Sequence, residues 1–296
     1  MNETVTTGAL TDFELARPRL FGIAYRMLGS ATEAEDILQD AWLRWQTVTD
    51  EVENPTAYLA TITTRLSLTA LDSARARRET YIGPWLPEPV STQDDPLLGA
   101  ERAEALSLAV LLLLERLTAA ERAAYVLHEA FDYSFRDIAE VLETSEANAR
   151  QLGKRAREHL ARERGSAVSP AERDRLLAAI TVAAQSGDLA ALEAVLSENV
   201  VSLSDGGGVV SAARNPVVGR NNVARFILGL LAKYTDGVTT QYLSVNGEPT
   251  LFAIREGLPL LIWQFDIGPD GVRGMFAILN PAKLRSFESI ALSHFG

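Results

Sequence analysis

The chain has 296 residues, a formal net charge of −11, a hydrophobic fraction of 47% and no cysteine. This length is enough for two or three domains with packed cores, and the hydrophobic fraction argues against a disordered chain. Without cysteine the chain has neither disulfides nor thiolate metal sites, and its three histidines are too far apart in sequence to suggest a shared metal ion. We therefore expect no metal and no cofactor.

The N-terminal residues 1–16 carry acids but no basic segment, which argues against a signal peptide. The longest apolar run, Ala105–Leu114, is too short to cross a bilayer and is typical of a buried helix face. These features predict a cytoplasmic protein that has no membrane partner.

Residues 10–80 form the first predicted segment, which is helical. Apolar residues recur at three-to-four spacing in Ala34–Trp45, as they do in a helix with one buried face. Thr32 and Glu35 have the spacing of a capping box, so we expect Thr32 to cap this helix. A further long helix is predicted over residues 56–80.

Residues 81–104 form the predicted linker. Four prolines lie between residues 81 and 99, together with glycines and paired acids. Prolines limit the flexibility of such a segment, so we expect a semi-rigid connection between two helical domains.

Residues 105–165 are predicted to be helical again, and Tyr133–Leu160 has the spacing of a helix-turn-helix motif. A short helix ends at Leu142, and Ser145 caps the helix that follows. Glu143, in the turn, stands where such turns often have glycine. A left-handed conformation there would cost about 1 kcal/mol, so we expect a turn of slightly different geometry.

Basic residues gather at two places in this acidic chain. Arg65–Arg78 has four bases against one acid, and Arg150–Arg164 has six bases against two acids. Such patches favour contact with DNA over a limited surface and leave the acidic remainder for other partners. The alternative interpretation is that both patches are solvated helix faces of mixed charge.

Residues 170–296 change in character and predict an α+β domain with helices against a curved sheet. Helices are expected over residues 170–186, 188–196 and 220–234, and a first strand over residues 200–204. Turn signals such as Asn246-Gly247 then separate four strands that would form an antiparallel meander. These strands are predicted over residues 238–245, 250–255, 260–267 and 272–279.

The first 165 residues resemble the extracytoplasmic-function (ECF) sigma factors of bacterial RNA polymerase, and Ala34–Trp45 carries the most specific part of the resemblance. The resemblance implies two all-α domains, sigma region 2 over residues 10–80 and sigma region 4 over residues 105–165. It implies that region 2 binds the polymerase core at the β′ clamp helices and opens the −10 promoter element. It also implies that region 4 reads the −35 element in the major groove, with the core β subunit as a further partner.

The same resemblance assigns site residues. The residues implied to bind the core polymerase are Glu35, Asp36, Gln39 and Asp40. The residues implied to bind DNA are Arg65, Arg75, Arg77 and Arg78 in region 2, and Arg150, Gln151, Lys154 and Arg155 in region 4. The loop Thr49–Thr56 would receive a base taken out of the stack, which costs a few kcal/mol that pocket contacts recover.

Three further motifs resemble a group of ECF sigma factors that is similar to sigma-J and carries a SnoaL-like C-terminal cone. The motifs are Trp85-Leu86-Pro87-Glu88-Pro89, Asp205-Gly206-Gly207-Gly208 and Asn280-Pro281-Ala282-Lys283-Leu284. The last motif departs from the pattern at Ala282, where an acid is usual. The resemblance implies that the other residues of the three motifs form a regulatory interface, through which residues 170–296 modulate the sigma factor in cis.

Two other functions stay open at this point. A one-component transcription regulator would join the helix-turn-helix to a ligand-sensing domain, but it leaves residues 30–80 unexplained. A SnoaL-like isomerase or hydrolase fused to a DNA-binding module would use polar strand residues such as Gln264, Asp266 and Tyr242. The simpler interpretation places these three at solvent-facing positions of alternating strands. No catalytic constellation can be placed, so we expect no enzyme activity and name no catalytic residue. An unidentified small ligand in the cone is a further candidate partner that could bias this modulation, although no motif specifies it.

Overall fold

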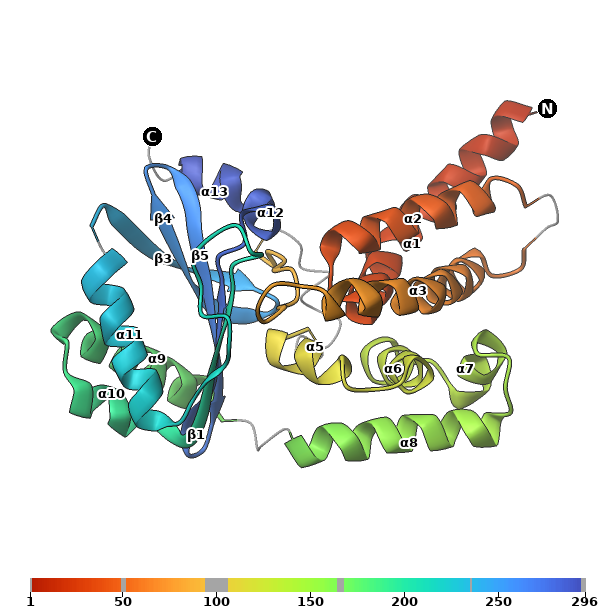
Figure 1. The fold of residues 1–296 in the computed structure, drawn as a ribbon. Coiled ribbons are helices and arrows are strands. Elements are labelled where there is room, and N and C mark those ends of the chain that lie inside the picture. The colour runs from red at the N-terminus through yellow and green to blue at the C-terminus, as the bar shows by residue number, and fades with distance from the viewer. Residues whose placement is uncertain (1, 49–51, 94–105, 164–167, 235, 294–296) are drawn as a thin grey trace. The chain divides into compact units, whose positions relative to one another are not determined.

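The structure is a computed structural model that describes residues 2–48, 52–93, 106–163, 168–234 and 236–293. The chain forms two compact units, which are considered separately (Figure 1). The helical unit consists of Met1–Thr80 and Asp94–Glu163, and the C-terminal unit consists of Tyr81–Gln93 and Arg164–Gly296. The first part of the predicted linker therefore belongs to the same unit as the C-terminal domain.

Parts of four predicted segments lie outside the described residues. They are residues 49–51 of the loop implied to receive a base, residues 94–104 of the predicted linker, residues 105 and 164–165 at the ends of predicted region 4, and residues 235 and 294–296 of the predicted C-terminal domain.

Three long helices form the first part of the helical unit: α1 (Asn2–Leu28), α2 (Ala31–Trp45) and α3 (Pro55–Glu79). They pack on one another through apolar faces at the predicted spacing, and Ile23, Leu38 and Leu59 are among the buried residues (Figure 1). Burial of such side chains contributes about 1.5–3 kcal/mol each, and this rather than intrinsic helix propensity holds the helices in place.

The helix starts follow from capping residues. Ser30 caps α2, because its hydroxyl accepts a hydrogen bond from the Glu33 amide at 3.2 Å. The predicted cap at Thr32 is therefore wrong, since the helix already begins at Ala31. At α3, the Asn54 side chain is the cap, and a proline fills the first position, where a missing N–H costs nothing.

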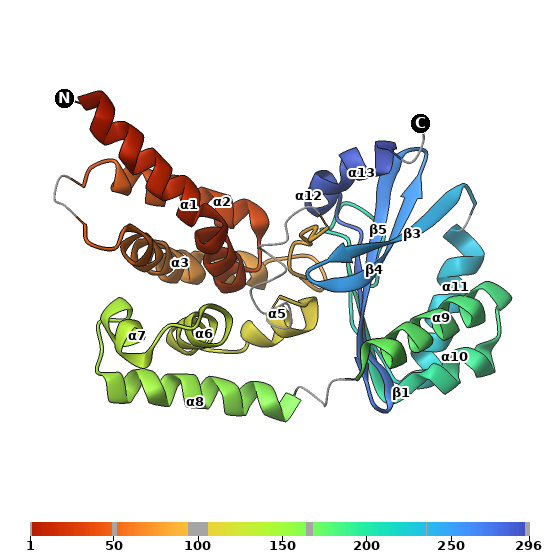
Figure 2. The ribbon, with the colours of Figure 1, turned by 180° about the vertical axis from the view of Figure 1, so that it is seen from behind.

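Short and medium helices make up the described residues 106–163 of the helical unit. They are α5 (Leu108–Leu114), α6 (Ala119–Tyr125), the π-helical turn η2 (Val126–Ala130), α7 (Phe135–Val141) and α8 (Glu146–Glu163). Figures 1 and 2 both show α8 running along α5, α6 and α7. Capping boxes start α6 and α7, at Thr118 and Ser134.

Helices α7 and α8 form the predicted helix-turn-helix. The Thr144 amide donates to the Ala139 carbonyl at 2.9 Å and the Glu143 amide to the Glu140 carbonyl at 3.4 Å, which is the hydrogen-bond pattern of a Schellman motif. This motif requires a left-handed residue at its centre, and Glu143 has φ +52°. The expectation of a different turn geometry is therefore wrong: the turn is conventional, and Glu143 bears a cost of about 1 kcal/mol.

The C-terminal unit is an α+β domain, as predicted. Its helices are α9 (Pro170–Ser186), α10 (Leu189–Val195), α11 (Arg220–Tyr234), α12 (Pro281–Leu284) and α13 (Glu288–Ser293), with the 3-10 turn η3 (Arg285–Phe287) before the last. Its strands are β1 (Leu196–Asp205), β2 (Val217–Val218), β3 (Val238–Val245), β4 (Glu248–Arg255), β5 (Leu258–Gly268) and β6 (Gly271–Ile278).

The six strands form one sheet in the order β2-β1-β6-β5-β4-β3. The antiparallel meander from β3 to β6 confirms the prediction, and its first two turns place Asn246-Gly247 and Glu256-Gly257 at positive φ. The sequence did not predict that β1 runs parallel to β6, nor that β2 pairs with β1. The three short helical segments after β6 were also not predicted.

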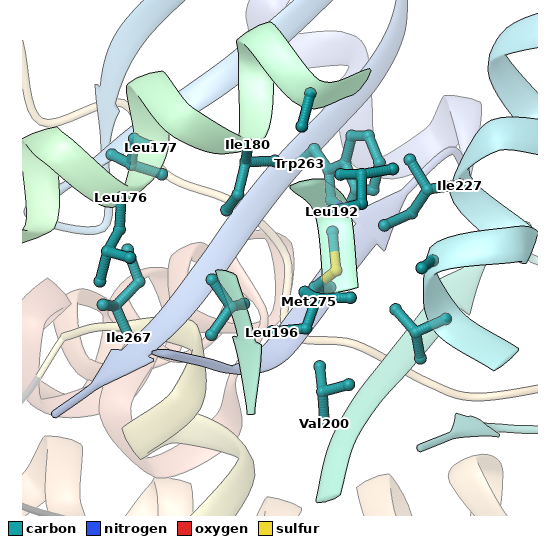
Figure 3. Close-up of a cluster of buried hydrophobic side chains, with 14 of the residues drawn as sticks. Leu176, Leu177, Ile180, Leu192, Leu196, Val200, Ile227, Trp263, Ile267 and Met275 are labelled. Atoms are coloured by element: carbon teal, nitrogen blue, oxygen red, sulfur yellow. The ribbon is translucent and has the colours of Figure 1, made fainter. Parts of the chain in front are cut away.

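One face of this sheet carries the main core of the unit. Figure 3 shows Ile180 of α9, Leu192 of α10 and Ile227 of α11 around Trp263 and Met275 of the sheet. Side chains alternate between the two faces of a strand. Neighbouring strand residues therefore point to the opposite face of the sheet. On that face the ring centres of Phe252 of β4 and Phe287 of η3 lie 5.8 Å apart.

Candidate functional site

The exposed side of α2 presents the residues that the resemblance assigns to the polymerase core. All four, Glu35, Asp36, Gln39 and Asp40, are exposed. Leu43 beside them is 53% exposed, while on the opposite side the Trp45 indole N–H donates to the Ala9 carbonyl at 2.9 Å. The tryptophan therefore anchors the helix. The acidic face is exposed, with Glu35 paired to Arg17 of α1 at 2.6 Å. The role of the acidic face in binding the polymerase core stays a prediction.

Arg65, assigned to DNA, is held by the helix-turn-helix. Its Nε donates to the Val141 carbonyl at 3.1 Å and its Nη2 to the Glu140 carbonyl at 3.0 Å, while Nη1 lies 3.1 Å from the Glu143 carboxylate. The two carbonyls end α7, where the helix dipole favours a cation. All three guanidinium nitrogens therefore face acceptors on the helix-turn-helix.

A second cluster centres on the Glu115 carboxylate, which no pattern in the sequence indicated. Arg78 donates to one oxygen and Arg122 to the other, the latter at 2.7 Å. Arg122 is fully buried and donates to the Met27 carbonyl at 2.7 Å, but its Nε and Nη2 have no partner among the described residues. Burial lowers the pKa of the Arg122 guanidinium, and the charge of Glu115 opposes that shift.

The remaining two arginines assigned to the −10 element are paired as well. Arg75 donates to the Leu117 carbonyl at 2.5 Å, and Arg77 donates to Glu33 of α2. All four assigned arginines of α3 therefore have partners inside the helical unit. Three of the four contact the part of the chain that carries the helix-turn-helix.

The outer face of α8 carries the residues assigned to the −35 element. All four, Arg150, Gln151, Lys154 and Arg155, are exposed. The inner face is buried, and at Gly153 an added Cβ would lie 2.8 Å from the Phe135 ring, so only glycine lets α7 approach this closely. Lys154 lies 3.7 Å from Glu158 one turn away, an exposed pair worth about 0.3–0.5 kcal/mol that leaves the lysine available to DNA.

A cavity of about 420 Å³ opens between α1, the start of α3 and the segment that leads into α7. Its polar lining includes Arg19, Asn54, Thr56 and Asp137. It lies beside Val52–Thr56, the described part of the loop implied to receive a base.

The three motifs assigned to regulation meet in the C-terminal unit, around the fully buried carboxylate of Asp205. This carboxylate accepts hydrogen bonds from the Tyr81 hydroxyl at 2.6 Å, the Leu86 amide at 2.9 Å and the Gly207 amide at 3.0 Å, and it pairs with Lys283 at 2.7 Å. One buried acid at the end of β1 therefore joins the linker to the motif that follows β6.

Lys283 holds the other side of this cluster. It also donates to the Leu86 carbonyl, and its ammonium lies 4.5 Å from the centre of the Trp85 ring and 5.3 Å from that of Tyr81. Contact with aromatic faces stabilises a cation that has left water. Lys283 therefore binds the linker through a charge, a backbone carbonyl and two rings.

Tyr81 is a member of this cluster that sequence reasoning missed. The Asn280 side chain donates to its hydroxyl at 2.8 Å while also capping α12. Burial raises the pKa of Tyr81, and the charge and hydrogen bond of Asp205 raise it further. Its position at the start of the predicted linker, four residues before Trp85, is the sequence feature that pointed to it.

The other residues of the three motifs serve the same contact in different ways. Leu86, Pro87, Pro89 and Leu284 are buried, Trp85 and Glu88 are half-buried, and Gly206 is buried beside Val210, whereas Pro281 and Ala282 are exposed. At Gly207 (φ +62°) an added Cβ would lie 2.5 Å from Asn280, and at Gly208 (φ +72°) it would lie 2.9 Å from Ile82. Both glycines are therefore required by backbone conformation and by close approach.

Residues 90–92 of the linker also pair with the sheet, which was not predicted. Ser91 forms an isolated antiparallel bridge with Val245 at the edge strand β3. The Thr92 amide donates to the Ser244 carbonyl, and the Asn246 amide donates to the Val90 carbonyl, both at 2.9 Å. The run Val-Ser-Thr after the prolines has strand propensity, a weak signal that was available in the sequence. These contacts cover part of an otherwise open sheet edge.

The polar strand residues considered for catalysis have structural partners. Gln264 is buried, not solvent-facing as the simpler interpretation had it, and its amide donates to the Val245 carbonyl at 2.9 Å. Asp266 pairs with Arg273 at 3.0 Å. Tyr242 is exposed and shares a hydrogen bond with Thr181 at 2.9 Å. The structure brings these three into no common site.

Within the ranges that the structure describes, no group of three or more potential ligands is arranged to hold a metal ion. In the same ranges, every helix falls short of the length or the apolar character needed to span a membrane.

Comparison with known proteins places both halves of the helical unit. Residues 13–77 match the family model of Sigma-70 region 2, and residues 107–160 match that of Sigma-70 region 4. The helix-turn-helix therefore lies in the region 4 match, and α2 with most of α3 lies in the region 2 match.

Similar proteins cover nearly the whole chain. The ECF RNA polymerase sigma factor SigJ of Mycobacterium tuberculosis is 39% identical over 290 residues, which are 96% of this chain and 90% of that protein. SigI of the same organism is 34% identical over 274 residues, which are 90% of this chain and 92% of that protein. The crystal structure of SigJ superposes with a TM-score of 0.75 at 35% identity and covers 93% of this chain and 98% of that one. The chain therefore belongs to the ECF sigma factors of RNA polymerase, which act in the initiation of transcription.

Proposed function

We propose that this sigma factor binds the core polymerase through α2, opens the −10 element with α3, reads the −35 element with α8, and is modulated in cis by its C-terminal unit. The exposed acceptors of α2 suit the β′ clamp helices, and contact of region 4 with the β subunit completes the core interface. The exposed bases of α8 suit a major groove. The site of action is then the cytoplasm, where the polymerase works.

The cluster around Asp205 is the observation that carries the regulatory part of this proposal. The segment it holds, Tyr81–Gln93, joins α3 to the region 4 helices along the chain. Promoter recognition requires two DNA-reading elements at a fixed separation on the duplex. A domain that fixes the conformation of their connection shifts the population of productive arrangements, either up or down.

The C-terminal unit acts in this proposal by binding and not by catalysis. Its polar strand residues already have partners, and the face of the sheet under α9, α10 and α11 is filled by apolar side chains such as Leu192 and Met275. The family resemblance implies a SnoaL-like cone in this unit. A small ligand bound there would need to displace some of these side chains. Turnover by the purified chain would argue for the enzyme alternative.

Run-off transcription with purified core polymerase tests the proposal. The full chain should direct promoter-specific transcripts, and Lys283→Met should change their amount several-fold, because Asp205 and the linker then lose their common partner. Lys233→Met on the exposed end of α11 is a matched control, since it removes the same charge from the same unit. Point variants are preferable to truncation after region 4, because truncation would also uncover the linker.

Each part of the proposal has its own contrary result. Equal transcription by the full chain, Lys283→Met and Lys233→Met would contradict regulation through the linker. Promoter-specific binding that neither needs nor gains from core polymerase would favour the one-component regulator instead.

A further inference from the structure

The contact between Arg65 and the helix-turn-helix joins two surfaces that are both assigned to DNA. Arg65 lies on the helix assigned to promoter opening, and its acceptors lie in the turn between α7 and α8. The Arg65 side chain is 44% exposed and that of Glu143 is 76% exposed. This contact is therefore close to solvent and can be exchanged for another partner.

The acceptors around Arg65 imitate a phosphate group. A phosphodiester offers a guanidinium anionic oxygens in a fork geometry, and here two carbonyl oxygens and one carboxylate take their place. The C-terminal end of α7 adds the negative end of a helix dipole. A DNA phosphate would thus have to displace the acceptors of the turn.

Glu143 is an unexpected residue for its backbone position. The centre of a Schellman motif favours glycine, yet a glutamate with φ +52° stands there. The carboxylate of this residue adds a side-chain acceptor for Arg65 to the two backbone carbonyls. The strain at Glu143 therefore coincides with the contact to Arg65.

A second attachment lies at the other end of α3. Arg75 donates to the Leu117 carbonyl, and Arg78 shares the Glu115 carboxylate with Arg122. This attachment is more buried than the first, since the side chains of Arg78 and Glu115 are 13% and 19% exposed. Region 4 is thereby attached to α3 at two places, one exposed and one buried.

We propose that the contact of Arg65 with the turn at Glu143 is a self-inhibitory latch, in which region 4 occupies the phosphate-binding arginine of region 2 until DNA displaces it. The inference rests on the proposed DNA contact of Arg65. In the latched state Arg65 and the turn satisfy each other, so neither is available to DNA. Release of the latch, followed by opening at Glu115, frees both DNA-reading surfaces together.

Glu143→Gly tests the latch with little risk to the fold, because glycine is the favoured residue at this φ. The matched control is Glu140→Gln, which removes the same charge three residues away but keeps the carbonyl that Arg65 uses. The probe is a forked duplex of arbitrary sequence, since phosphate contacts do not depend on sequence. The full-length Glu143→Gly variant should bind it about two- to fivefold more tightly than wild type, as expected for loss of an exposed ion pair.

The latch would be contradicted by equal gains in Glu143→Gly and Glu140→Gln, because removal of any acid would then suffice. It would also be contradicted by no gain in Glu143→Gly. Arg65→Ala distinguishes failure of the latch from failure of the proposed DNA contact of Arg65. Unchanged affinity of this variant for the forked duplex would refute the DNA contact itself.

A distance measurement gives a second readout that needs no polymerase. The chain has no cysteine, so spin labels can be attached at cysteines introduced for the exposed residues Ser73 of α3 and Arg136 of α7. The free wild-type chain should show one short distance, and excess forked duplex should lengthen it. Glu115→Gln, checked by circular dichroism for an intact fold, should add a longer distance without DNA. A distribution that DNA leaves unchanged would overturn the latch.

Discussion

The two units each join segments that are far apart in sequence through a carboxylate, Asp205 in the C-terminal unit and Glu115 in the helical unit. Asp205 is fully buried, and each of its oxygens has two partners. Glu115 is partly exposed and serves two arginines, of which Arg122 keeps two nitrogens without a partner among the described residues. We call the Asp205 cluster the clasp, because both oxygens of its carboxylate have all the partners they can accept. The Glu115 cluster is incompletely paired, so we expect its contacts to exchange more easily.

The chemistry of the donors adds to this contrast. The clasp at Asp205 uses a phenol, backbone amides and one lysine that also lies against two rings. The helical unit uses arginines, whose planar fork binds phosphate as well as carboxylate. Arg65 and Glu143 are also exposed, so a phosphate can reach their contact, whereas the Lys283 side chain is 12% exposed and that of Asp205 is fully buried.

Asp205→Asn should produce the largest loss of stability. It leaves the Lys283 ammonium buried without its counter-charge, which costs about 3–5 kcal/mol. Hydrogen exchange in β1 and in the linker reports this unit separately from the other. Asp270→Asn, in an exposed turn, is the control. Glu115→Gln also leaves a buried cation, Arg122, without its counter-charge, but the Glu115 carboxylate is 19% exposed, so the cost to the helical unit should lie at the lower end of this range, about 3 kcal/mol. A larger loss for Glu115→Gln would reverse the contrast between the two carboxylates.

The double change Lys154→Ala with Arg155→Ala should reduce initiation from promoters that depend on the −35 element by about tenfold or more, as two lost DNA contacts imply. Association with core polymerase, measured by co-purification, should not change. The control is Arg225→Ala with Lys233→Ala, which removes two charges from α11. Loss of core binding in the first double variant would mean that α8 faces the polymerase and not DNA.

Tyr81→Phe should change the alkaline stability of the C-terminal unit. The pKa of Tyr81 is raised in the folded state, so its stabilising contribution is complete below the ordinary tyrosine pKa of about 10 and is lost as the pH rises above it. The variant should cost about 1.5–3 kcal/mol at neutral pH, because it removes the hydrogen bond to the Asp205 carboxylate as well as the one from Asn280. It should also show a weaker loss of stability at high pH. Thermal unfolding across this range, with Tyr242→Phe as control, measures the difference. Parallel profiles for wild type and Tyr81→Phe would exclude a raised pKa.

Glu143→Gly should have the smallest effect on stability. Relief of the left-handed conformation gains about 1 kcal/mol, and loss of the exposed ion pair with Arg65 costs about 0.2–1 kcal/mol, so the two nearly cancel. The thermal midpoint of the helical unit should therefore shift by no more than a few degrees. A marked fall would show that Glu143 holds the fold together, in which case its contact is as permanent as the clasp.

Several parts of this fold were predictable because they depend on neighbouring residues. The helix-turn-helix over α7 and α8 follows from apolar spacing and the cap at Ser145. The meander from β3 to β6 follows from turn residues such as Asn246-Gly247. The error at Thr32 has a similar local origin, since Ser30 offers an equivalent hydroxyl two residues earlier.

The residues of the candidate sites were partly predictable, but their partners were not. A motif resemblance was enough to select Asp205 and Lys283, whereas Tyr81 and Arg122 belong to no motif that was recognised. The assignment of Arg65 to DNA came from the family resemblance and from its place in a basic patch. Nothing in its neighbourhood along the chain indicated that it would pair with Glu143.

Local periodicity and motifs were thus sufficient for the long helices, the hairpins and the family, while the roles of the candidate residues stay predictions. The parallel pairing of β1 with β6, the linker strand beside β3 and the two carboxylate clusters depend on folding. The physical reason is that these contacts join residues tens to hundreds of positions apart. Their free energy comes from burial and from the pairing of polar groups in three dimensions, for which a linear pattern carries no signature.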